Sequence, residues 1–133
     1  MDPTRPEALT VLVADDEAGV RQFCAEVLEE QGYRVLVAEN GRYALEVAAA
    51  HQSPIHLLLS DVMMPELDGP DLAKQLRLVR PDIRVVFMSA YRGSMAALTY
   101  GYPFLQKPFP PDRLIQVIHD VLAQPSMPIP KNL

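Results

Sequence analysis

Five short apolar runs alternate with segments of helical periodicity along most of the chain, and this alternation constrains the fold more than any other feature. The runs are continuous and rich in Val, Leu and Ile, which is typical of parallel strands covered on both faces of a sheet. We expect strands at residues 10–14, 33–38, 55–60, 83–88 and about 103–106.

Helices are expected in the segments between the strands, where apolar residues recur with a helical period. Capping, glycine and proline residues mark their ends. The first helix runs from about 17 to 31 before Gly32, the second follows Asn40 as its N-cap, the third starts near Pro70 and ends at Pro81, and the last spans about 111–123.

Repeated strand–helix units predict right-handed crossovers and a three-layer α/β sandwich. Five strands fit a parallel, flavodoxin-like sheet in the order 2-1-3-4-5, whose ligands bind at the carboxyl ends of the strands. We expect one domain over residues 9–123, preceded by a flexible segment 1–8 and followed by a Pro-rich tail 124–133.

Carboxylates follow two strands that this order places side by side. Asp15 and Asp16 come directly after the first strand, and Asp61 comes directly after the third. Three like charges at one edge raise the pKa of at least one of them unless a cation neutralises the group. Hard oxygen ligands at a solvent-facing edge suit Mg²⁺.

Groups suited to a phosphoryl oxygen follow the remaining strands at the same edge. Ser89 ends the fourth strand and Lys107 follows the fifth. With a divalent cation between them, an aspartate at this edge is a competent nucleophile toward phosphorus.

Four segments together resemble the receiver domain of two-component response regulators, including those attached to hybrid histidine kinases. They are Val11-Leu12-Val13-Ala14-Asp15-Asp16-Glu17, Asp61-Val62-Met63-Met64-Pro65-Glu66-Leu67-Asp68-Gly69, Met88-Ser89-Ala90-Tyr91 and Phe104-Leu105-Gln106-Lys107-Pro108-Phe109. The resemblance covers residues 9–123. It implies a phosphorelay module with slow intrinsic autophosphorylation and autodephosphorylation.

The resemblance also assigns roles to the acidic edge. Asp61 is expected to take a phosphoryl group from a histidine kinase or a histidine phosphotransfer protein. Asp16 and Asp61 are expected to bind Mg²⁺ directly, Asp15 through water, and Met63 through its backbone carbonyl.

The switch residues follow by the same resemblance. Lys107, ahead of a cis bond to Pro108, pairs with a phosphoryl oxygen, and Ser89 moves to bind the phosphate. Ala90 leaves room for the phosphoryl group. Phe104 matches the switching aromatic but lacks a hydroxyl, so its switch depends on packing.

Composition bears on partners and location. A formal net charge of −5 argues against a nucleic-acid surface, and no apolar run reaches the length of a membrane span. The N-terminus has no signal-peptide core, and Cys24 is the single cysteine. We therefore expect a cytoplasmic monomer or weak homodimer without direct nucleic-acid binding or membrane insertion.

Two other functions stay open, and so does the structure of the segment between the fourth and fifth strands. One is a Mg²⁺-dependent aspartyl-phosphate phosphohydrolase, and the other is a pseudo-receiver that binds partners without phosphate. The stretch from Ser89 to Lys107 is short, so residues 91–100 are expected to hold a shortened, irregular fourth helix. The chain is either a stand-alone regulator or a piece of a hybrid kinase.

Overall fold

A computed structural model describes residues 8–90 and 101–125, which form a five-stranded parallel sheet in the order β2-β1-β3-β4-β5. The strands are β1 (Thr10–Ala14), β2 (Arg34–Ala38), β3 (Leu57–Asp61), β4 (Arg84–Ser89) and β5 (Phe104–Gln106). The helices are α1 (Ala18–Glu30), α2 (Gly41–Ala50), α3 (Gly69–Val79) and α5 (Pro111–Ala123). The predicted fold and strand order are confirmed.

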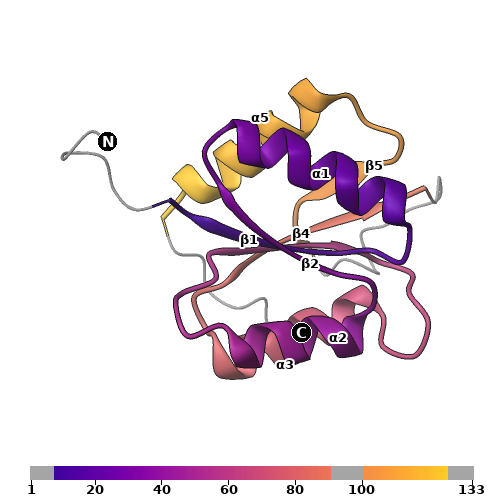
Figure 1. Ribbon diagram of the computed structural model, residues 1–133, viewed down its shortest axis with the longest axis vertical. Coiled ribbons are helices and arrows are strands. Elements are labelled where there is room, and N and C mark those ends of the chain that lie inside the picture. The colour runs from indigo at the N-terminus through magenta and orange to yellow at the C-terminus, as the bar shows by residue number, and fades with distance from the viewer. Residues whose placement is uncertain (1–7, 91–100, 126–133) are drawn as a thin grey trace.

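The sheet is the middle of three layers, with α1 and α5 on one face and α2 and α3 on the other (Figure 1). Successive residues of β1 point to opposite faces. Val11 and Val13 join the core cluster beneath α1 and α5, whereas Leu12 and Ala14 join the cluster beneath α2 and α3. Burial on both faces explains why the strands are continuously apolar.

The third strand begins and ends later than the sequence predicts. The Nδ1 atom of His56 accepts a hydrogen bond from the Thr10 amide at 2.9 Å, so a side chain takes part in the pairing at that end. At the other end, the Val62 amide donates to the Met88 carbonyl at 3.0 Å, and this bond carries the ladder past Asp61. Asp61 is therefore the last residue of the strand, held by the sheet itself.

The loop that leaves β3 is fixed by an N-cap and a close backbone contact. The Asp68 side chain accepts a hydrogen bond from the Asp71 amide at 2.9 Å and caps α3, as the Asn40 side chain caps α2 through the Tyr43 amide at 2.7 Å. A Cβ atom on Gly69 would clash with the Asp61 carbonyl oxygen. The start of α3 thus lies directly against the backbone of the site.

Some expectations lie outside the described residues. These are the fourth helix at 91–100, residues 1–7 of the N-terminal segment, and residues 126–133 of the tail. Among the helices of the described part, none has the length and apolarity required to cross a bilayer.

Candidate functional site

Parallel pairing of β1 with β3 brings two buried carboxylates together. Ala14 pairs with Ser60, so the next residue on each strand, Asp15 and Asp61, lies at the same edge of the sheet. Asp15 is fully buried and Asp61 is 7% exposed. The Met63 amide donates to the Asp61 carboxylate at 3.3 Å, and the Glu17 amide donates to that of Asp15 at 2.9 Å.

Lys107 supplies a cation between these carboxylates. Its Nζ atom lies 2.6 Å from Asp15 Oδ2, 3.3 Å from Asp61 Oδ2 and 3.4 Å from Glu17 Oε1. The lysine side chain is 10% exposed, so its contacts with the buried Asp15 and Asp61 are little screened by water, whereas Glu17 is 66% exposed and its contact is screened. The structure brings Lys107 to the carboxylate edge, although it follows Asp61 by 46 residues.

The acidic side chains outnumber this single cation. One carboxylate oxygen from each of Asp15, Asp16, Glu17 and Asp61 lies within 4.8 Å of the others. Asp16 and Glu17 are exposed while Asp15 and Asp61 are buried, so the cluster opens to solvent on one side. All four offer hard oxygen atoms, and this donor set fits a hydrated divalent cation such as Mg²⁺.

Glu17 was not predicted as a site residue. Its position directly after Asp15 and Asp16 was visible in the sequence, but that run is also a common start for a helix. The structure adds the observation that distinguishes the two readings, which is the 3.4 Å contact between Glu17 and Lys107.

Burial and mutual repulsion set the protonation of the cluster. Burial raises the pKa of Asp61 above its usual value, Lys107 opposes this rise, and Asp15 adds to it. Burial likewise raises the pKa of Asp15, against the hydrogen bond from Lys107. Burial alone would lower the pKa of Lys107, but its contacts with Asp15 and Asp61 outweigh burial and raise it. One lysine therefore leaves the carboxylates short of positive charge.

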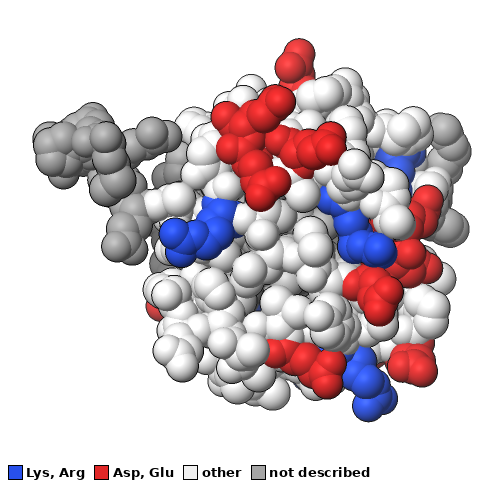
Figure 2. All heavy atoms as spheres, in the orientation of Figure 1, with Lys and Arg blue, Asp and Glu red and all other residues white. Residues whose placement is uncertain are grey.

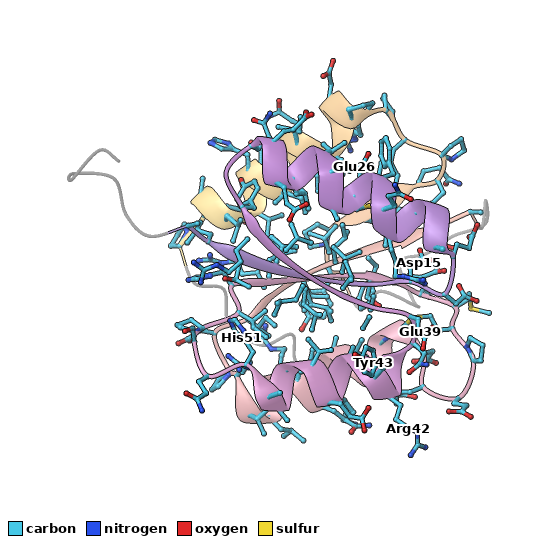
Figure 3. The ribbon with its side chains drawn as sticks, viewed as in Figure 1. Asp15, Glu26, Glu39, Arg42, Tyr43 and His51 are labelled. Atoms are coloured by element: carbon cyan, nitrogen blue, oxygen red, sulfur yellow. The ribbon has the colours of Figure 1, made fainter. Side chains whose placement is uncertain are left out.

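Acidic side chains lie along the right-hand edge of the space-filling view, with basic side chains among them, and a larger acidic group lies at the top, over α1 (Figure 2). Asp15 is labelled on the right-hand side in Figure 3, and Glu39 and Arg42 are labelled below it, on the loop and helix that follow β2. The negative charge of the site therefore comes from its own clustered carboxylates.

The remaining predicted residues surround the cluster. Ser89 is the buried last residue of β4, and its carbonyl accepts a hydrogen bond from the Lys107 amide at 2.8 Å. Ala90 is exposed beside it. Phe104 starts β5 and is half-buried against the cluster beneath α2 and α3, on the face opposite to Leu105. The Lys107–Pro108 bond is cis.

Residues 11–119 match the family model of the response regulator receiver domain. The chain belongs to this family. Over 121 residues it is 37% identical to the sensor kinase CckA of Brucella abortus, covering 86% of this chain and 13% of that protein. It is 36% identical over 81 residues to the response regulator receiver protein CpdR of the same organism, covering 61% of this chain and 66% of CpdR.

A solved receiver domain shows the same architecture. The crystal structure of the receiver domain of the hybrid histidine kinase CckA superposes with a TM-score of 0.74 at 36% identity, covering 85% of this chain and 98% of that structure. The chain spans only a part of the curated relatives, 13% of CckA and 66% of CpdR. The similarity is therefore to the receiver domains of these proteins and not to their whole length.

A groove runs beside the acidic cluster of this receiver domain. It has a volume of about 450 Å³ and lies between the start of α1 and the segment after β5. Its walls include Val20, Phe23, Ala90, Pro108 and Phe109, with Lys107 and Glu17 at the side of the cluster. Phe23 and Phe109 face each other with ring centroids 6.0 Å apart.

Proposed function

We propose that this receiver domain is a phosphoacceptor in a two-component phosphorelay, with Asp61 as the residue that takes the phosphoryl group. Receiver domains as a family act with histidine kinases or phosphotransfer proteins and bind Mg²⁺ in an acidic pocket. The observation that carries the proposal is the placement of Lys107 Nζ between Asp15 and Asp61 at 2.6 and 3.3 Å.

The reaction requires an ionised nucleophile beside concentrated positive charge. A carboxylate oxygen of Asp61 would attack the phosphorus of a phosphohistidine, forming a P–O bond as the P–N bond breaks and the imidazole leaves. Mg²⁺ held by Asp15, Asp16, Asp61 and the Met63 carbonyl would offset the repulsion between the two anions. Lys107 would pair with a phosphoryl oxygen.

The proposed switch starts from the added charge, about −1.5 to −2 at neutral pH. Lys107 and Ser89 lie on neighbouring segments and share a backbone hydrogen bond of 2.8 Å, so a shift of one affects the other. The exposed Ala90 leaves space beside them. Phe104 is only half-buried, which leaves its ring room to change packing.

The groove beside α1 is a suitable place for the phosphodonor to bind. It is largely apolar, it includes Ala90 and Lys107 in its walls, and it therefore leads to the acidic cluster. A donor helix packed against the contacting rings of Phe23 and Phe109 would present its phosphohistidine to Asp61. We accordingly propose a histidine kinase or a histidine phosphotransfer protein as the partner.

Incubation with Mg²⁺ and a small acyl-phosphate donor tests the acceptor. We expect a mass increase of one phosphoryl group in the native protein and none in Asp61→Asn. Asp68→Asn is the matched control, because asparagine keeps the N-cap of α3. No mass increase in the native protein, or an equal one in Asp61→Asn, would overturn the proposal. Steady turnover of a phosphomonoester would favour a phosphohydrolase instead.

The switch is tested separately with Lys107→Ala. We expect this variant still to accept phosphate on Asp61 but to lose the chemical-shift changes that phosphorylation causes near Ser89 and Phe104. Shift changes equal to those of the native protein would contradict the role assigned to Lys107.

A further inference from the structure

A second polar site lies at the opposite end of the sheet. A small cavity of about 70 Å³ is enclosed by the ends of α3 and α5, the start of β4 and the segment before β5. Arg84 is the first residue of β4, while Asp61 pairs with Met88 farther along that strand. Four residues of strand place the cavity about 13 Å from the acidic cluster.

Within the residues that the structure describes, three buried donor groups beside this cavity have no acceptor in hydrogen-bond geometry. They are the Nε atoms of Arg77 and Arg84 and the hydroxyl of Tyr102. All three residues line the cavity. Leaving a buried donor unsatisfied costs about 1–3 kcal/mol, and more for a charged group, so an acceptor is expected here.

The two arginines are anchored by their other nitrogen atoms. Arg77 is 8% exposed, and its Nη1 donates to the Ile83 carbonyl at 2.8 Å. Arg84 donates from Nη2 to the Gln124 carbonyl at 2.6 Å and from Nη1 to the Leu122 carbonyl at 3.4 Å. These bonds hold both guanidinium groups in place but do not neutralise their charge.

No carboxylate within the described residues forms an ion pair with Arg77 or Arg84. Asp82 also lines the cavity, but it is exposed and forms no ion pair with either arginine. Arg84 lowers the pKa of His56 in addition to the effect of burial. Arg77 partly opposes the rise that burial causes in the pKa of Tyr102, through its charge and through a side-chain contact with the hydroxyl oxygen, and the hydrogen of that hydroxyl still has no acceptor within the described residues. The positive field of the pair therefore reaches its neighbours.

We propose that this cavity binds one small oxyanion, held by Arg77, Arg84 and Tyr102. An oxyanion supplies the missing acceptors and the missing negative charge together, whereas water supplies only acceptors. A water molecule takes about 30 Å³ of liquid, so a cavity of about 70 Å³ has room for one carboxylate or phosphate group and little more. The site is distinct from Asp61 and independent of the proposed phosphotransfer.

The test is a titration of isotope-labelled protein with inorganic phosphate, with the ionic strength held constant by sodium chloride. The amide chemical shifts are measured at each phosphate concentration. EDTA is present, so the acidic cluster holds no metal that could recruit the anion. We expect saturable shifts at Arg84, Val85 and Leu122, and none at Asp61. A parallel titration with acetate distinguishes a phosphate site from a carboxylate site by which anion binds more tightly.

Variants connect the shifts to the three donors. Arg84→Met should weaken binding about tenfold or more, since a hydrogen bond from a charged donor is lost. Tyr102→Phe should weaken it about threefold to tenfold while keeping the ring contact with Phe87 at 5.7 Å. Asp82→Asn should strengthen it, and Arg42→Met, which removes an exposed arginine, should leave it unchanged.

Shifts that never saturate, or that are the same in chloride alone, would overturn the proposal. So would equal affinity in the native protein and Tyr102→Phe, a variant that removes one oxygen atom and tests the site even if Arg84→Met fails to fold. Shifts that never saturate would mean that water fills the cavity, and equal affinities would mean that the anion binds elsewhere.

Discussion

The two ends of the sheet carry buried side-chain charge of opposite sign. At the carboxyl end, Asp15 and Asp61 are buried around a single Lys107, and the surplus is negative. At the amino end, Arg77 and Arg84 are held by backbone carbonyls, and the surplus is positive. The carboxyl end has more negative than positive side-chain charge, and the amino end has more positive than negative. We therefore expect a bound cation at the carboxyl end and a bound anion at the amino end.

The two ends also differ in the space beside them. At the acidic end, the backbone under Asp61 is packed so closely against Gly69 that no side chain fits there, while a groove of about 450 Å³ lies beside the carboxylates. At the arginine end, a cavity of only about 70 Å³ lies between the helix ends and the strands. A groove suits a macromolecular partner, whereas the small cavity has room for a small ligand only.

Mg²⁺ should have the largest effect, and only at the acidic end. At a Mg²⁺ concentration 100 times its Kd, we expect the free energy of unfolding to rise by about 2.7 kcal/mol. Calorimetric melting with and without Mg²⁺ measures this rise. The rise should be lost in Asp61→Asn. It should be kept in Asp82→Asn, which removes an acidic residue at the arginine end of the sheet. An equal loss in both variants would mean that the two ends do not differ as described.

Gly69→Ala should lower the free energy of unfolding by about 2–3 kcal/mol, because the new methyl group forces the Asp61 backbone to move. Gly19→Ala is the matched control, since a Cβ atom at Gly19 meets nothing within 4 Å. It should be neutral or slightly stabilising in α1. Denaturant unfolding of both variants checks the contrast, which fails if Gly69→Ala is as stable as the native protein.

Tyr102→Phe should be stabilising by about 0.5–1 kcal/mol without added anion, because it removes a buried hydroxyl whose hydrogen has no acceptor within the described residues. Excess phosphate should stabilise the native protein more than Tyr102→Phe, so that the native protein then melts at the higher temperature. Thermal melting in chloride and in phosphate provides the comparison. A destabilising effect in chloride would show that the hydroxyl already has a good acceptor.

The pH dependence of Asp61 should give the smallest effect. Its raised pKa means that the folded state holds the proton more tightly than the unfolded state, so this carboxylate lowers stability as pH rises above its ordinary value of 3.8. Without Mg²⁺, Asp61→Asn should therefore melt higher than the native protein at pH 7. The difference should disappear toward pH 3.8 and below. A native protein that melts higher at pH 7 would contradict the assigned direction.

The acidic end could be read from the sequence because local position determines it. Asp15 and Asp61 each follow an apolar run, and the strand order alone makes them neighbours. Lys107 follows from the same rule at the end of β5. The contribution of Glu17 was missed, since a sequence gives no sign of whether the side chain of an N-cap residue turns toward a distant lysine.

The arginine end could not be read in this way. Arg77 lies within a helix, Arg84 starts a strand and Tyr102 precedes β5, so no motif or spacing connects them. Their proximity depends on how α3 and α5 end over the sheet. The late start of β3 had a similar origin, because the His56 side chain takes the Thr10 amide hydrogen bond.

The sequence by itself determined the alternation of strands and helices, the order of the sheet and the carboxylate and lysine positions at its carboxyl edge. The reason is that apolar periodicity and strand ends are local properties that parallel topology converts into proximity. The tertiary structure alone decided the distances around Lys107, the close contact at Gly69 and the cavity between Arg77, Arg84 and Tyr102. These depend on side-chain packing between elements distant in the chain, which no local pattern encodes.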